Sequence, residues 1–278
     1  MNFRMNILFM EKPEKNNILK RVFKPIECIN KKIFLNYELN KTSTKKKIKL
    51  VAKVKNILKI HKSNTIIISK NIKDDKEFMD ILYSNNINII DGRNLFKRLA
   101  IDTVQCIVKQ KKFDINDSRI AILTNEYDGI IENIIKSLSM QCKNLQIITN
   151  HIKKFERIES ELYEDEIIIN VMNNKRKSLL KTNIILNIDF PNETINKFNI
   201  YENATIVNFE EKTKINKKRF SGKIINWYKA GIENKEQIFG FLEEKNIYKY
   251  DFNELIECLY LLDIINAEDI YLESLVTR

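Results

Sequence analysis

The sequence predicts an α/β protein: an N-terminal α/β domain, then a doubly wound parallel sheet, then a short helical C-terminal tail. Short runs of β-branched residues alternate along the chain with segments whose apolar residues recur at helical spacing. This alternation is typical of parallel sheets that are covered by helices on both faces. Only five glycines and three prolines occur in 278 residues, which is too few for the turn-rich strands of an all-β sandwich.

The first domain is expected over residues 1–112. Ser43 or Thr44 offers an N-cap for a helix that continues to about His61, with apolar residues on one face and lysines on the other. A second long helix begins at Asn94. The strands of this domain are expected at 5–10, 32–37, 64–69 and 87–90, and a further helix opens at Asp74 and Asp75.

The second domain is expected over residues 113–232, after a polar connection, and a helical tail follows over residues 233–278. The tail is acidic, and its leucines and isoleucines recur at helical spacing. The strands of the second domain are expected at 119–123, 145–149, 166–171, 183–188 and 204–209, with helices that end at Met140 and Leu162.

The formal charge of +11 is unevenly distributed along the chain. Residues 1–62 carry a net charge of +13, residues 63–234 carry +4, and residues 235–278 carry −6. A basic segment of this kind is typical of binding to an anionic partner such as a nucleic acid. It is equally consistent with attraction between the two ends of the chain within the fold.

The four cysteines are scattered and include no C-x-x-C pair, which favours reduced thiols in a cytoplasmic protein. No metal site is predicted, because no His, Cys and Asp residues recur at metal-ligand spacing. No run of 18 apolar residues occurs, so we expect no membrane span and no membrane partner.

The order strand, turn, helix, strand, helix, strand over residues 119–171 fits the first half of a nucleotide-binding Rossmann unit. The phosphate-binding fingerprint G-x-G-x-x-G would then fall at residues 124–129, where only Gly129 is present. Thr124 replaces the glycine of the tight turn, and Asn125 follows it. Glu126 replaces the second glycine and would bring a negative charge toward a diphosphate.

The end of the next predicted strand carries Asn150, Lys153 and Lys154 in place of the acidic residue of an NAD site. Basic side chains suit the 2′-phosphate of NADP, so NADP is the cofactor expected if any binds. The alternative is that Asn150 caps the following helix and the lysines are solvated.

Two stretches carry a family resemblance. LQIITNHIKKFERIESEL and LLKTNIILNIDFP resemble strands of the NADP-binding domain of the shikimate dehydrogenase and glutamyl-tRNA reductase type of two-domain enzyme, within residues 94–209. The resemblance implies a catalytic α/β domain followed by a Rossmann domain. The candidate cofactor-binding residues are then Thr124, Asn125, Glu126, Gly129, Asn150, Lys153, Lys154 and Asn187.

The catalytic residues stay unknown at this stage. His61, His151, Asp91 and Asp189 are the polar side chains considered, and each has an ordinary structural role available. His61 lies at the edge of an apolar helix face, and Asp91 precedes a glycine in a turn. Asp189 follows a predicted strand, at the end of the sheet where α/β proteins bind ligands.

From these observations we expect a Rossmann-like protein that has lost catalysis and canonical dinucleotide binding. It would act as a binding or regulatory module for a protein or small molecule, without a cofactor. The first alternative is an NADP-dependent oxidoreductase of the shikimate dehydrogenase and glutamyl-tRNA reductase type with a divergent phosphate loop. The second alternative is nucleic-acid binding through residues 1–62.

Overall fold

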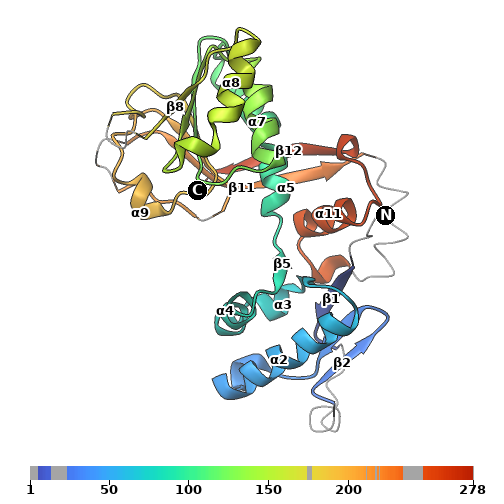
Figure 1. Cartoon of the computed structure of the whole chain (residues 1–278). Helices are drawn as coiled ribbons and strands as arrows, with labels where there is room; N and C mark the ends of the chain where they lie inside the picture. The colour runs from blue at the N-terminus through green and yellow to red at the C-terminus, as the bar shows by residue number, and fades with distance from the viewer. Residues whose placement is uncertain are drawn as a thin grey trace. The chain divides into compact units, whose positions relative to one another are not determined.

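The computed structural model describes residues 6–13, 24–173, 177–210, 212–216, 218, 220–233 and 247–277. The chain divides into two compact units (Figure 1). Unit 1 comprises Met1–Gly92 with Ile232–Ile270, and unit 2 comprises Arg93–Gly231 with Tyr271–Arg278. The first division therefore lies just before the helix that begins at Arg93, and the chain returns to unit 1 after Gly231.

The sheet of unit 1 has the strand order β2-β3-β1-β4-β5. Four of these strands run parallel, and β2 pairs antiparallel with β3. The two residues that join β2 to β3, Asn30 and Lys31, have φ angles of 49° and 62°, as a type I′ hairpin turn requires. The strands are β1 (Ile7–Glu11), β2 (Ile26–Ile29), β3 (Lys32–Leu35), β4 (Thr65–Ile68) and β5 (Asn88–Ile90).

Helices α2 (Thr44–Ile60) and α4 (Lys76–Ser84) cover one face of this sheet, and the short helix α3 (Lys70–Lys73) follows β4. Val54 of α2 and Phe78 of α4 share a buried core with Leu8 and Ile66 of the strands. The side chains of β1 alternate, so Leu8 and Met10 face these helices while the intervening residues face the other way.

One lysine of the basic N-terminal segment points inward. Lys47 of α2 is 5 % exposed and forms ion pairs with Asp75 at 2.8 Å and Glu77 at 2.7 Å. Asp75 also caps α4 by accepting a hydrogen bond from the backbone N–H of Phe78. Part of the N-terminal positive charge is therefore neutralised within unit 1.

The second face of the unit 1 sheet is covered by α11 (Phe252–Leu261), which belongs to the C-terminal tail. Leu255 of α11 and the preceding Tyr250 share a core with Ile7, Phe9 and Ile67 of the strands. The rings of Phe9 and Tyr250 meet edge to face with centroids 5.6 Å apart. The acidic tail therefore packs in the same unit as the basic start of the chain.

Charged residues of the tail pair with unit 1 at the carboxyl end of its sheet. Lys73 forms ion pairs with Asp251, at 3.1 Å, and with Glu254. Lys249 lies 3.5 Å from Glu11, the last residue of β1. Burial raises the pKa of the Glu254 carboxyl to about 8, although Lys73 opposes this shift. The Glu254 carboxyl therefore gives up its proton at a higher pH in the native state than in the unfolded chain.

The sheet of unit 2 has the strand order β12-β11-β10-β9-β6-β7-β8. The strands β11, β10, β9, β6, β7 and β8, which are neighbours in this order, run parallel to one another. The chain adds β7 and β8 on one side of β6 and then returns to add β9, β10 and β11 on the other side. This order is found in doubly wound sheets. The strands are β6 (Arg119–Leu123), β7 (Asn144–Ile148), β8 (Asn170–Met172), β9 (Ile184–Asn187), β10 (Thr205–Asn208), β11 (Lys223–Ile232) and β12 (Ile270–Thr277).

The helices of unit 2 divide between the two faces of its sheet. Helices α5, α6 and α7 contact one another, and α7 contacts β7. The opposite face carries a core in which Phe190, Ile195 and Phe198, around α9, pack on Ala121 and Ile206 of the strands. The helices are α5 (Arg93–Arg98), α6 (Ala100–Lys111), α7 (Gly129–Ser139), α8 (Glu156–Glu164) and α9 (Asn192–Ile195).

The expected fold class is confirmed: the protein is α/β, with two sheets that are mainly parallel and helices between the strands. The tail differs from the expected helix, because it ends in β12. Lys229 of β11 pairs with Glu273 of β12 at 2.8 Å. A Cβ on Gly231 would lie 2.3 Å from the ring of Tyr271, so a larger residue here would displace this partly exposed side chain.

We predict that Glu254→Gln reduces the pH dependence of unit 1 stability. The native pKa of Glu254, about 8, lies above its ordinary value of 4.5. Its contribution to stability is therefore complete below about pH 4.5 and is lost as the pH rises through about 8. Glutamine has no such proton to lose, so the free energy of opening of unit 1 should fall less between pH 6 and pH 9 in the variant.

Hydrogen-exchange protection of the β1 and β4 amides, corrected for intrinsic rates, measures this difference in unit 1 alone. Glu268→Gln, which changes an exposed carboxylate in the same unit, is the matched control. Equal loss of protection in the wild type and in Glu254→Gln would contradict the prediction.

Candidate functional site

The loop after β6 is held by a carboxylate of the chain itself. Asp189, just beyond β9, accepts hydrogen bonds from the backbone N–H groups of Asn125 at 2.7 Å and Glu126 at 2.8 Å. Thr124 Oγ1 lies 3.4 Å from the same carboxylate. In a dinucleotide site, backbone N–H groups of this loop approach the pyrophosphate. Here Asp189 occupies the position of that anion.

The free backbone N–H groups at the start of α7 are likewise satisfied by a carboxylate of the chain. The Asp128 carboxylate accepts hydrogen bonds from the backbone N–H groups of Ile130 and Ile131, both at 2.9 Å. These N–H groups have no partner within the helix and would otherwise attract an anion. Gly129 is the first helical residue, and a Cβ there would meet nothing within 4 Å. Two aspartates therefore satisfy the groups that a bound phosphate would use.

The structure brings several of the other candidate cofactor-binding residues to this loop. The backbone N–H of Asn150 donates to Asn125 Oδ1 at 2.9 Å, and Lys154 Nζ donates to the Asn125 carbonyl at 3.1 Å. Thr124, Glu126 and Gly129 belong to the loop and the helix start. That these residues bind a cofactor stays a prediction.

Two of the candidates lie apart from this network. Lys153 is exposed on the 3-10 turn η2 (Ile152–Lys154). Asn187 is 2 % exposed at the end of β9, where its amide nitrogen donates to the Phe190 carbonyl at 3.0 Å and to Asn208 Oδ1 at 3.2 Å. Asn187 therefore has a structural role in holding the turn that presents Asp189.

Of the polar side chains considered for catalysis, Asp189 has the central position in the loop network. In the sequence, Asp189 stood out by its position directly after a predicted strand. His61 is the C-cap of α2 in unit 1, where its Nε2 lies 3.4 Å from Cys28 Sγ. His151 is exposed before η2. The loop thus gathers no set of acid, base and nucleophile.

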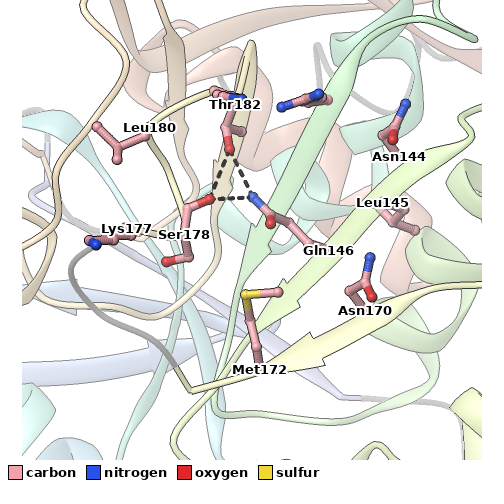
Figure 2. A pocket seen from close by; sticks show the side chains of 11 residues that line it. Asn144, Leu145, Gln146, Asn170, Met172, Lys177, Ser178, Leu180 and Thr182 are labelled. Carbon is pink, nitrogen blue, oxygen red and sulfur yellow. Dashed lines mark hydrogen bonds between the residues drawn. The ribbon is translucent and has the colours of Figure 1, made fainter.

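A cavity of about 400 Å³ opens elsewhere in unit 2, at the amino ends of three neighbouring strands. Arg119, Asn144 and Asn170 are the first residues of β6, β7 and β8, and all three line it. Figure 2 shows the side chains around this space. The complete lining is Arg119, Asn144, Leu145, Gln146, Asn170, Met172, Lys177, Ser178, Leu180, Lys181 and Thr182.

The connection between β8 and β9 borders this cavity and contributes Lys177, Ser178, Leu180, Lys181 and Thr182 to its lining. Leu179 of this connection is fully buried on the sheet. The neighbouring residues bridge the starts of β6 and β7 without filling the space below them.

Hydrogen bonds fix this connection to the sheet. Gln146 Nε2 of β7 donates to the Ser178 carbonyl and to Thr182 Oγ1, both at 2.8 Å (Figure 2). Thr182 is 1 % exposed, so its end of this bridge is shielded from water. These hydrogen bonds connect the wall of the cavity to β7.

The lining of this cavity has one sign of charge. Arg119, Lys177 and Lys181 contribute three cationic groups, and the lining residues that the structure describes include no carboxylate. Amide and hydroxyl groups supply hydrogen-bond donors and acceptors, and Leu145, Met172 and Leu180 supply apolar surface. A volume of about 400 Å³ is within the usual range of small-molecule sites. The cavity can therefore hold an organic anion.

The described part of the chain lacks two kinds of feature. No group of three or more His, Cys, Asp and Glu side chains there is placed to hold a metal ion. Nor do those residues include a helix that is both long enough and apolar enough to cross a membrane.

No protein-family model matches this sequence, and no curated protein matches it either. Solved structures do match, and two of them are carbamoyltransferases. A protein assigned as an aspartate carbamoyltransferase from Trypanosoma cruzi is 11 % identical, with 73 % of this chain and 71 % of that chain covered and a TM-score of 0.27. The ornithine carbamoyltransferase from Pyrococcus furiosus is 10 % identical, with 75 % and 73 % covered and a TM-score of 0.30.

These matches correct the family resemblance drawn from the sequence. The structural neighbours are carbamoyltransferases, so the resemblance to the shikimate dehydrogenase and glutamyl-tRNA reductase type is wrong. The assignment of an NAD(P)-binding domain is wrong with it, as are the degenerate module and the NADP-dependent oxidoreductase that it implied. The physical reason is that a doubly wound strand order is shared by many unrelated functions.

We predict that Asp189→Ala loosens the loop after β6. The variant removes charge-assisted hydrogen bonds to two backbone N–H groups, so unit 2 should lose about 2 kcal/mol of unfolding free energy. Urea unfolding followed by fluorescence of the single tryptophan, Trp227 in unit 2, measures the loss. Hydrogen exchange at the amides of residues 125 and 126 should also become faster.

Asp165→Ala is the matched control, because it removes an exposed carboxylate of the same unit. The role given to Asp189 fails if both variants have the stability of the wild type.

Proposed function

We propose that the protein binds a small organic anion in the cavity at the amino ends of β6, β7 and β8. The observation that carries this proposal is the lining: three cationic groups, with no carboxylate among the described lining residues, surround a space of about 400 Å³. Cations collected without counter-charges repel one another, and an anionic ligand relieves that repulsion. The partner is therefore a small molecule.

The lining also limits the shape of the ligand. The cationic groups lie at the rim, on Arg119 at the start of β6 and on Lys177 and Lys181 of the connection. Met172 and Leu180 provide apolar contacts. A ligand with one or two carboxylate or phosphate groups on a short carbon skeleton satisfies both kinds of surface.

The expectation that no cofactor binds, with NADP as the alternative, stays a prediction. The hydrogen bonds from Asn125 and Glu126 to Asp189 support it, because they occupy the backbone groups that a diphosphate would use. A cytoplasmic location is likewise proposed, on the ground that Cys28, Cys106, Cys142 and Cys258 are free thiols.

We predict that organic anions stabilise unit 2 and that the cationic side chains of the cavity contribute to this effect. Citrate and glycerol 3-phosphate are the first probes, titrated at constant ionic strength while Trp227 fluorescence follows thermal unfolding. A ligand at 100 times its Kd adds about 2.7 kcal/mol to the apparent stability. Lys181→Gln and Arg119→Gln should each weaken binding about tenfold, since each removes a charge-assisted hydrogen bond.

Lys197→Gln serves as the control, because this exposed lysine of unit 2 lies outside the cavity lining. The proposal is wrong if neither probe shifts the transition, or if Lys181→Gln and Arg119→Gln respond to the probes as the wild type does.

A further inference from the structure

A second, smaller cavity of about 110 Å³ lies in unit 2 and shares no lining residue with the first. It is formed by the last turns of α6 and by β10, β11 and β12. The lining residues are Ile107, Gln110, Lys111, Thr205, Lys223, Ile225, Leu275 and Thr277.

The strand register brings two polar side chains to the same place in this cavity. Thr205 and Lys223 are the first residues of β10 and β11, and they are direct partners across the parallel pair. Side chains alternate along a strand, so Thr205 and Lys223 lie on the same face of the sheet, as does Ile225. Ile206 packs in the core of the opposite face. Thr205 and Lys223 therefore face the α6 side, where Lys111 closes the cavity.

Thr205 has an unused hydrogen-bonding group. Its side chain is fully buried, and Oγ1 makes no hydrogen bond within the part of the chain that the structure describes. Buried hydroxyl groups are nearly always paired, because an unpaired one retains the full cost of desolvation. Thr205 is one of the residues that line the cavity, so a ligand bound there could accept a hydrogen bond from this hydroxyl.

Two lysines share this cavity without a carboxylate in the lining. Lys111 Nζ donates to the Asn203 carbonyl at 3.0 Å, which leaves its other N–H groups available. Burial and the nearby Lys223 lower the pKa of Lys111. Among the described residues, neither lysine forms an ion pair with a carboxylate.

The C-terminal end of α6 borders this cavity, and its negative partial charge repels an anion only weakly. A helix C-terminus carries a partial charge of roughly −0.5. Two ammonium groups carry a full positive charge each, so the potential in the cavity is positive. The small volume excludes a nucleotide but accommodates a tetrahedral anion.

We propose that this cavity binds a phosphate-sized tetrahedral oxyanion, held by Lys111 and Lys223 and by a hydrogen bond from the Thr205 hydroxyl. The ligand is either free phosphate or the phosphate group of a small monoester. This site is independent of the larger cavity and of the function proposed for it.

The test is calorimetric titration of the full chain with inorganic phosphate at constant ionic strength. We expect saturable binding that Thr205→Val and Lys223→Gln each weaken about tenfold, because each removes a charge-assisted contact. Thr205→Val keeps the shape of the side chain and removes only the hydroxyl, so folding should be preserved. Lys229→Gln is the matched control, since this exposed lysine also lies on β11 but outside the cavity.

Lys181→Gln separates this inference from the proposed function, because Lys181 lines only the larger cavity. Phosphate binding that survives Lys181→Gln but not Lys223→Gln supports the small site even if no organic anion binds to the larger one. Three results would each overturn the inference. Phosphate binding is lost in Lys181→Gln, or it is unchanged in both Thr205→Val and Lys223→Gln, or it does not saturate.

Glycerol 2-phosphate in a parallel titration distinguishes the two sources of the anion. Equal affinity for both probes supports a monoester phosphate, and preference for phosphate supports the free anion. Absence of binding by both probes overturns the site.

Discussion

Both faces of a parallel sheet must be covered by other parts of the chain, and this constraint determines the architecture of both units. In unit 1, α2 and α4 cover one face, and the chain has to return from residue 232 to supply α11 for the other. In unit 2, the helices before and after β6 cover one face, while α9 and its neighbours cover most of the other. Where the cover is incomplete, cavities appear.

The two ends of the unit 2 sheet differ in a way that follows from the same constraint. At the carboxyl ends, Asp189 and Asp128 satisfy the backbone groups that ligands use in most α/β proteins. At the amino ends, the connection between β8 and β9 borders a cationic cavity, and two lysines meet over Thr205 in another. Both of these cationic cavities of unit 2 therefore lie at the amino ends of its strands.

The sequence predicted the elements whose apolar pattern is local and strong. The runs at 64–69 and 119–123 are buried strands, and the helix after Ser43 lies where its N-cap and apolar face placed it. β12 was missed because its pairing partner, β11, is distant in sequence. The cavities could not be predicted, because they depend on the packing of one crossover and on strand register. The family resemblance failed because strand order alone does not identify a function.

The return of the segment Ile232–Ile270 to unit 1 has a consequence for how the protein is made. On the ribosome, the strands of unit 1 emerge long before α11 does, so Ile7, Phe9 and Ile67 have no cover while unit 2 is being synthesised. Unit 2 lacks only its edge strand β12 at that stage and can fold around its own core. Unit 1, although encoded first, is therefore completed late, and one apolar face of its sheet stays uncovered until α11 has been made.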